Sequence, residues 1–262
     1  MFAYYPLYRL VRFSLYRPNR FGTGEVYVGP SNITDVLGGE EFRDGLWITV
    51  KYLIYTVPTG LVLGLLLALV AHRRLRGIKA FQAIFASTVA TSVAVAAVVF
   101  FGLVNPKIGK FGQVSFIDLS KSDSALRGVS LTSIWQNIGL TFVIVLTGLP
   151  AVPDHLMEAA QLDGFGPVRR LFKVTLPLIS PTLLFLVVVL MIFGFQAFAP
   201  MEILTNGDPA GSTETLVFKI FNRQGPSLIS EGSVMALGLF GLTFIVTLIQ
   251  LTILNRRVHY GE

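Results

Sequence analysis

The sequence reads Glu158-Ala159-Ala160-Gln161-Leu162-Asp163-Gly164 and, after nine further residues, Val174-Thr175-Leu176-Pro177. This stretch lies between two apolar runs that are long enough to cross a bilayer. It therefore predicts an ordered loop on the surface of a membrane protein. Because the chain has no evident catalytic constellation, we expect this loop to be a docking element.

Composition places the chain among integral membrane proteins. Its 262 residues are 53% hydrophobic and 14% charged, with a mean hydropathy of +0.67, whereas soluble domains carry about 25% charged residues. The chain has no cysteine, which excludes disulfides, thiolate metal sites and cysteine nucleophiles. Its three histidines, His72, His155 and His259, lie outside the apolar runs and share no ligand spacing, so we expect no metal site.

Membrane-spanning helices are the main predicted elements. A helix needs about 20 apolar residues to cross the hydrocarbon core, and transmembrane barrel strands would alternate with period two instead. The apolar runs of this chain are long and apolar on all sides. We therefore predict an all-α fold, a polytopic transmembrane helical bundle, with spans at about 46–71, 80–104, 131–151, 178–200 and 233–254.

The positions of lysine and arginine predict the orientation of these spans. Residues 72–79 hold four fixed positive charges and no acid, which is typical of a cytoplasmic loop. Counting forward, 105–130 and 201–232 are expected outside, and 152–177 and the C-terminal tail in the cytoplasm. The net charge of +6 is therefore explained by topology and contact with the lipid bilayer. No motif supports binding to nucleic acid.

The N-terminal residues 1–45 do not fit this topology, so we treat them apart from the five-span core 46–262. Arg9, Arg12, Arg17 and Arg20 are positive charges on the expected outer side. One explanation is that Phe2 to Tyr8 is the outer end of a first spanning helix whose earlier part is missing from this chain. The alternative is an amphipathic helix in the membrane interface, with Tyr4, Tyr5 and Tyr8 at the headgroups.

The predicted spans contain almost no ionisable residue. Apart from Lys51, which we expect to reach toward the headgroups, they hold no Asp, Glu, Lys, Arg or His. Ion-coupled carriers and intramembrane hydrolases need such groups at membrane depth, so both are disfavoured. Neutral side chains remain as candidates to line a substrate path, with helix packing as the alternative role: Gln136, Asn137, Gln196, Phe195 and Phe198.

The loop 152–177 has the pattern of two short helices. Asp154 is the expected N-cap of a helix from His155 to Asp163, which Gly164 ends. Gly166-Pro167 starts the second helix. We expect Ala159 and Ala160 to form a small surface for close approach of a partner, with Leu156 and Leu162 as apolar anchors and Glu158 as a charged contact.

At these residues the chain resembles the membrane subunits of binding-protein-dependent ABC importers. Their signature is Glu-Ala-Ala, three residues, Gly, nine residues and Ile-x-Leu-Pro, and here Val174 takes the isoleucine place. Similarity to the carbohydrate-uptake branch extends over nearly the whole chain, through Val28–Asn32, Leu103–Pro106, Asn206–Pro209 and Thr213–Leu216. The resemblance implies the type I importer permease fold, in a bacterial or archaeal cytoplasmic membrane, and six spans where five are predicted here.

The resemblance also implies partners. The chain lacks the G-x-x-x-x-G-K-[ST] phosphate loop, so ATP and Mg²⁺ would belong to a separate ATPase dimer, and no cofactor is expected here. A second homologous permease and an extracytoplasmic solute-binding protein would complete the assembly, with Asn206, Gly207, Asp208 and Pro209 contacting the latter. Residues implied in coupling to the ATPase are Glu158, Ala159, Ala160, Asp163, Gly164, Leu176 and Pro177.

The substrate is less well indicated. Within the branch, residues 163–173 are most similar to importers of sn-glycerol-3-phosphate or glycerophosphodiesters. An anionic substrate ordinarily needs an arginine or lysine in its path, and the spans have no central cation, so a neutral sugar or oligosaccharide stays open as the alternative. A channel or carrier that works without ATP and a membrane scaffold are the remaining hypotheses.

Overall fold

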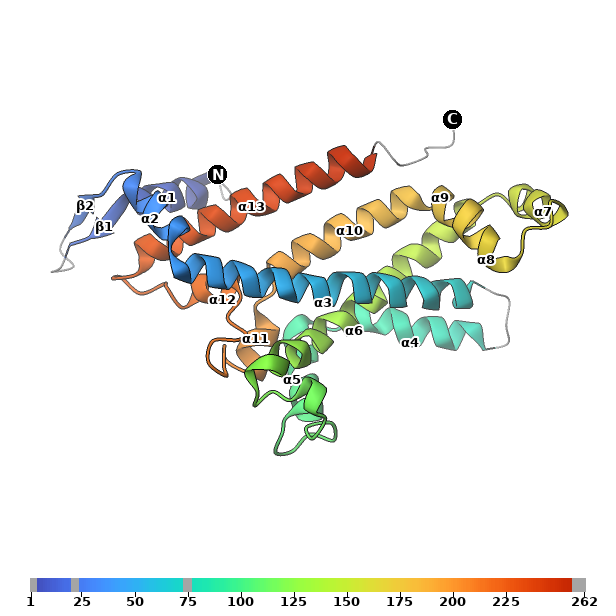
Figure 1. Cartoon of the computed structure of the whole chain (residues 1–262), viewed down its shortest axis with the longest axis horizontal. Coiled ribbons are helices and arrows are strands. Elements are labelled where there is room, and N and C mark those ends of the chain that lie inside the picture. Colours follow the sequence, from blue (N-terminus) through green and yellow to red (C-terminus); the bar gives the residue numbers. More distant parts are fainter. Residues whose placement is uncertain (1–3, 20–23, 73–76, 256–262) are drawn as a thin grey trace.

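The computed structural model describes residues 4–19, 24–72 and 77–255. These residues are almost entirely helical, with one pair of antiparallel strands, which confirms the predicted all-α class (Figure 1). The first half contains α1 (Tyr4–Leu15), β1 (Tyr16–Pro18), β2 (Glu25–Tyr27), α2 (Ser31–Gly38), α3 (Glu40–Ala71), α4 (Ile78–Ala90), α5 (Val93–Val104), η1 (Ser115–Ile117), α6 (Ser122–Gly148) and η2 (Leu149–Ala151). The second half contains α7 (Asp154–Leu162), α8 (Pro167–Arg170), η3 (Leu171–Thr175), α9 (Leu176–Leu178), α10 (Ser180–Phe195), α11 (Ala199–Leu204), α12 (Leu216–Phe221) and α13 (Ile229–Asn255).

Two of the five predicted spans are bent rather than straight. By length and apolarity α3, α6 with η2, and α13 are each able to cross a membrane. The predicted run 80–104 is divided into α4 and α5, whose axes are bent by 106° relative to each other. Of the predicted run 178–200, the long helix is α10, which is bent by 72° relative to the preceding helical residues 167–178. Among the described residues there are thus three spans, or up to five if each bent pair is one span.

Two spanning helices begin earlier than predicted. α3 begins at Glu40 rather than at residue 46, and α6 begins at Ser122 rather than at 131. Both extra turns are polar, and hydropathy reports where the apolar part of a helix ends, not where its backbone hydrogen bonds end. Of the predicted external segment 105–130, only residues 105–121 therefore connect α5 to α6.

α3 and α6 cross at close range because α3 carries two glycines one turn apart. A Cβ added to Gly60 would lie 2.4 Å from Asn137 Cβ, and one added to Gly64 would lie 2.5 Å from Thr141 Cβ. Small residues at this spacing let two helix backbones approach each other in a membrane. This crossing holds the centre of the bundle together.

The two predicted cytoplasmic loops lie at the same end of the bundle. Figure 1 shows the last turn of α3, the first turn of α4 and all of α7 and α8 at one end, while α2 lies at the other. This agrees with the predicted topology, in which both loops share one side of the membrane. That this side is the cytoplasm stays a prediction.

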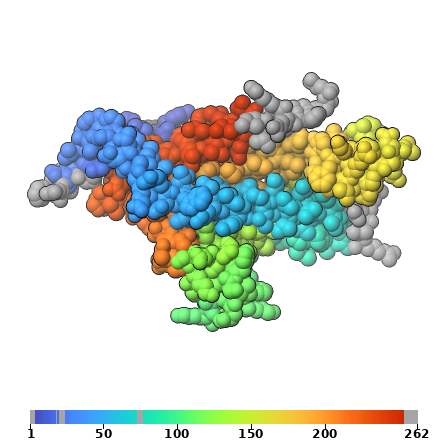
Figure 2. All heavy atoms as spheres, in the orientation of Figure 1, coloured from blue at the N-terminus to red at the C-terminus, as the bar shows by residue number. Residues whose placement is uncertain are grey.

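α5 and residues 105–121 stand out from the side of the bundle. Figures 1 and 2 show this segment projecting away from the long helices. Val95, Val98 and Val99 of α5 are exposed. α5 therefore presents much apolar surface to the outside of this chain.

The N-terminal segment packs against α13. Asn32 is buried and accepts from Arg17 Nε at 3.0 Å, while its amide donates to Ser14 O at 2.7 Å and Ser230 Oγ at 3.0 Å. Both explanations of this segment require a helix, and α1 is that helix. The choice between a truncated span and an interfacial helix stays a prediction, and the division at residue 45 falls within α3.

Candidate functional site

The predicted docking loop is an ordered bracket of α7, α8, η3 and α9. Gly164 has a φ of +76° and ends α7, where Phe165 N–H donates to Ala160 O at 2.9 Å. A left-handed residue is favourable only for glycine, which explains why the helix stops here. Arg170 Nη1 donates to Gln161 Oε1 at 3.2 Å and thereby ties the second helix to the first. The bracket has a defined angle rather than a loose connection.

The structure places most of the predicted coupling residues on the surface of this bracket. Glu158, Ala159, Asp163 and Gly164 are exposed, and Leu176 and Pro177 are half-buried. Leu162 is 88% exposed and is a large apolar side chain with no partner in the described chain around it. Val168 and Phe172 of the bracket are exposed as well, and several exposed apolar side chains on one element favour a binding surface.

Two details of the bracket differ from the prediction. Asp154 is the first residue of α7 rather than its N-cap; Pro153 holds the cap position, without a side-chain hydrogen bond. The Asp154 carboxylate still complements the N-terminal end of the helix dipole. Ala160 is only 6% exposed, because α8 and η3 pack on this side of α7, so of the two alanines Ala159 alone presents the small surface.

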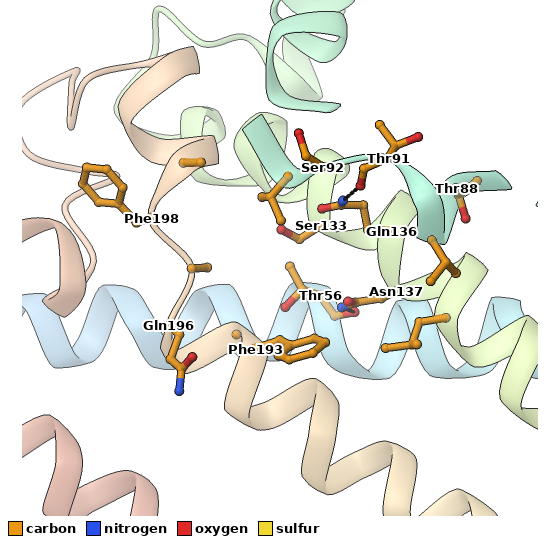
Figure 3. Close-up of a pocket in the computed structure, with 16 residues that line it drawn as sticks. Thr56, Thr88, Thr91, Ser92, Ser133, Gln136, Asn137, Phe193, Gln196 and Phe198 are labelled. Atoms are coloured by element: carbon orange, nitrogen blue, oxygen red, sulfur yellow. Dashed lines mark hydrogen bonds between the residues drawn. The ribbon is translucent and has the colours of Figure 1, made fainter. Parts of the chain in front are cut away.

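A second candidate site forms where α4 and α5 meet. Thr91 and Ser92 are extended, and Ser92 Oγ accepts from Val95 N–H at 3.3 Å, which caps α5. Gln136 Nε2 of α6 donates to the Thr91 carbonyl at 3.1 Å (Figure 3). Backbone groups freed by a break need such partners, and broken helices at membrane depth are tolerated where they line a cavity.

The break borders a cavity of about 540 Å³. Its walls come from α3, α4, α5, α6 and the residues around the end of α10 (Figure 3). No ionisable side chain is among the residues that line it, and its polar groups are hydroxyls and amides. These polar residues are Thr56, Thr88, Thr91, Ser92, Ser133, Gln136, Asn137 and Gln196.

Four of the five predicted path residues line this cavity, and one does not. Gln136, Asn137, Gln196 and Phe198 are at its wall, although Gln196 lies apart from the other amides in Figure 3. Asn137 is only 8% exposed, and its Nδ2 donates to Thr56 O at 3.3 Å. Phe195 is 3% exposed and packs in an apolar cluster with Leu53, Val57 and Leu190. Its expected place in the path is therefore wrong, because the last turn of α10 directs it into the core.

The hydroxyl groups of this cavity were not among the predicted path residues. Thr88, Thr91 and Ser92 lie within the apolar run 80–104, and Thr56 and Ser133 lie on the facing helices. A signal was present, because three hydroxyl residues within five positions of a spanning run favour a break or a polar face.

We expect Gln136→Leu to destabilise the protein, because the Thr91 carbonyl at the break loses its donor. This hydrogen bond is part-buried, and the net contribution of a typical one is about 0.5–1.5 kcal/mol. Thermal unfolding of the purified chain in micelles measures the change. Gln196→Leu is the matched control: Gln196 is exposed, its side chain makes no hydrogen bond in the described residues, and a change within ~0.5 kcal/mol is expected. Equal unfolding temperatures for both variants would contradict the role of Gln136.

The predicted receptor-contact residues form a tight turn between α11 and α12. Asn206 and Gly207 have φ angles of 50° and 87°, and the Asp208–Pro209 peptide bond is cis. Thr213 N–H donates to Gly207 O at 3.3 Å and closes the turn. Together with residues of the 105–121 connection, Asp208 and Pro209 line a shallow cavity of about 370 Å³. The two external segments thus meet, while their contact with a receptor stays a prediction.

Comparison with known proteins identifies the family. Residues 60–260 match the family model described as "Binding-protein-dependent transport system inner membrane component". The chain belongs to this family. It is therefore a multi-pass inner-membrane permease component of an ABC importer, and the match includes α7 and most of the cavity at the α4–α5 break.

Relatives of this permease extend over nearly its whole length. The sn-glycerol-3-phosphate transport system permease protein UgpA of Yersinia pestis is 32% identical over 99% of this chain and 91% of the relative. The protein of the same name from Agrobacterium fabrum is 30% identical over 100% and 92%. Among solved structures, a bacterial alginate ABC transporter in complex with an alginate pentasaccharide-bound periplasmic protein contains a chain with a TM-score of 0.81, at 19% identity over 100% and 91%. This likeness confirms the type I importer permease fold.

Proposed function

We propose that this permease imports glycerol-3-phosphate or glycerophosphodiesters by alternating access, driven by a separate ATPase dimer through α7. The cavity at the α4–α5 break carries the proposal, because it borders a broken helix between the long helices and is lined by uncharged hydrogen-bonding groups. Hydroxyls and amides suit the glycerol moiety, whose own hydroxyls need donors and acceptors. The relatives named for sn-glycerol-3-phosphate transport support this substrate class.

The proposed energy input is the bracket. Its fixed angle supports a lever, and the exposed Leu162 and Glu158 offer an apolar and a charged contact to a partner. A lever of this kind shifts a two-state equilibrium only if the partner binds the two states with different affinity. Closure of the ATPase dimer when it binds ATP would meet that condition.

The proposed assembly also contains a second homologous permease and an extracytoplasmic solute-binding protein. The turn Asn206–Pro209 and the connection 105–121 would face this receptor, with α7 and the C-terminus in the cytoplasm. Among solved relatives of this fold, the alginate transporter was seen with a periplasmic protein. The cavity at the α4–α5 break, the inner cavity, has no cation among its lining residues. The phosphate of an anionic substrate would therefore be neutralised by the second permease or by the receptor.

A neutral sugar or oligosaccharide is the second candidate substrate. The observation that favours it is the same uncharged lining, since an anion gains most from a charged donor. The fold and the proposed coupling would be unchanged.

Reconstituted uptake tests these proposals. The chain, its second permease and its ATPase are placed in liposomes with the receptor, and accumulation of labelled glycerol-3-phosphate and of maltose is measured with and without ATP. We expect glycerol-3-phosphate to accumulate only with ATP and receptor. Accumulation of maltose alone would favour the second candidate, uptake without the ATPase would indicate a carrier or channel, and ATP hydrolysis without uptake of either solute would indicate a scaffold.

A further inference from the structure

A second polar cavity, of about 420 Å³, lies at the outer end of α3. Its walls are residues 44–55 of α3, the first turns of α6, the loop before α12, and Lys219 of α12. It is separate from the cavity at the α4–α5 break, and no residue lines both. Lys51, which is expected to reach toward the headgroups, is among the lining residues of this outer cavity.

The outer cavity combines aromatic and charged side chains. Trp47 is 57% exposed, and Lys51 Nζ lies 5.2 Å from the centre of its ring. Asp44, Asp123 and Tyr55 share the same wall. Among the residues that the structure describes, neither Lys51 nor these two carboxylates takes part in an ion pair.

The other charges of the outer cavity neutralise one another. Lys219, with a side chain only 8% exposed, has its Nζ 2.8 Å from Glu41 Oε2 and 3.5 Å from Glu214 Oε2. Ser212 Oγ, in contrast, is buried and has no hydrogen-bond partner in the described chain. Among the described lining residues, the groups without an ion-pair or side-chain hydrogen-bond partner thus include the Lys51 ammonium, the Asp44 and Asp123 carboxylates, and the hydroxyls of Tyr55 and Ser212. This set offers both donors and acceptors without a strong excess of either charge.

We propose that the outer cavity is a second solute site, which a polyhydroxylated solute occupies between its release from the receptor and its arrival in the inner cavity. Trp47 would contact the C–H face of the solute, and the free carboxylates and ammonium would bind its hydroxyls. A few convergent polar groups beside an aromatic wall are typical of a small-molecule site. This proposal rests on the function proposed above and adds a second binding site to the path of the solute.

The positions of the two cavities along the helices support this order. On α3, Tyr55 lines the outer cavity and Thr56 the inner one; on α6, Leu126 lines the outer cavity and Ser133 the inner one, two turns further along. Tyr52 of α3, fully buried, donates its hydroxyl to Ser133 Oγ, a lining residue of the inner cavity. The same two helices therefore line both cavities.

Cysteine protection tests the outer site directly, because the chain has no cysteine of its own. Ser122→Cys and Ala210→Cys place a thiol on exposed lining residues of the outer cavity, and Ser120→Cys places one on the neighbouring shallow cavity as a control. The complete transporter in liposomes is treated from outside with a membrane-impermeant thiol reagent, and labelling is read on the band of this chain. We expect glycerol-3-phosphate or maltose, at ten times its dissociation constant, to slow labelling at 122 and 210 roughly tenfold and to leave 120 unchanged.

A second variant separates binding from folding. In the Ser122→Cys background, we expect Trp47→Ala to abolish the protection while the thiol is still labelled in the absence of solute. Protection by neither solute, equal protection at 120, or thiols at 122 and 210 that are never labelled in the complete transporter would each overturn the outer site. Wild-type uptake measured in parallel separates the two proposals: ATP-driven uptake without protection contradicts only the outer site, whereas no uptake contradicts the proposed function.

Discussion

Gly164→Pro is expected to leave the permease in the membrane but to lower ATP-driven uptake at least tenfold. Gly164 has a φ of +76°, and its N–H donates to Gln161 O at 3.1 Å. Proline holds φ near −65° and has no N–H, so it removes both features. The second helix of the bracket would then no longer hold α7 at its present angle. A tenfold loss of uptake rate corresponds to ~1.4 kcal/mol of activation free energy.

The measurement is a pair of assays on the reconstituted transporter, uptake and ATP hydrolysis. We expect hydrolysis to continue without stimulation by loaded receptor. Gly166→Ala is the control, because Gly166 has a φ of −66° and an added Cβ meets nothing within 4 Å. Glu158→Lys, which reverses the charge of an exposed residue on α7, is expected to uncouple in the same way. Normal uptake by both Gly164→Pro and Glu158→Lys would show that α7 is not the docking element.

Gly64→Val is expected to prevent normal packing of α3 on α6. A Cβ at this position would lie 2.5 Å from Thr141 Cβ and 2.7 Å from the backbone oxygen of Ile138. A side-chain rotation is unable to relieve the second contact, because the obstructing atom belongs to the backbone. Overpacking of a core ordinarily lowers the free energy of unfolding by about 1–3 kcal/mol. Because Gly64→Val displaces two crossing helices, we expect a loss at the upper end of this range.

The loss is measured as the thermal unfolding temperature and as the amount of folded chain recovered from membranes. Gly241→Val in the middle of α13 is the matched control, since a Cβ there meets nothing within 4 Å. We expect this control to behave like the wild type and Gly60→Val to behave like Gly64→Val, because the Gly60 Cβ would lie 2.4 Å from Asn137 Cβ. Equal recovery of Gly64→Val and Gly241→Val would contradict the close crossing.

Much of the architecture could be predicted because it depends on local properties. Long apolar stretches sum to spanning helices whatever their neighbours are, and α3, α6 and α13 each contain most of a predicted run, although α3 and α6 begin earlier. The bend between α4 and α5 was missed because Thr91 and Ser92 are compatible with a helix by themselves. The partner that makes the break tolerable, Gln136, is 45 residues away in the sequence.

The docking bracket could be predicted better than the cavity for a related reason. α7 begins and ends within one residue of the predicted helix, since a proline, an acidic first residue and a glycine with positive φ are signals within one segment. Phe195 was misplaced because its direction depends on where α10 ends, and the sequence around it does not show that end. Ala160 was misplaced because α8 and η3 cover it.

From the sequence alone it followed that this is a polytopic membrane protein with an ordered Glu158–Pro177 loop and almost no charge within its spans. These are properties of composition and of contiguous segments. Tertiary contacts alone brought Thr56, Thr91, Gln136 and Gln196 to one cavity, and brought Lys51 of α3 and Asp123 of α6 to another. The physical reason is that a cavity is bounded by residues far apart in the chain, whose distances are set by how helices cross, as Gly60 and Gly64 set the crossing of α3 and α6.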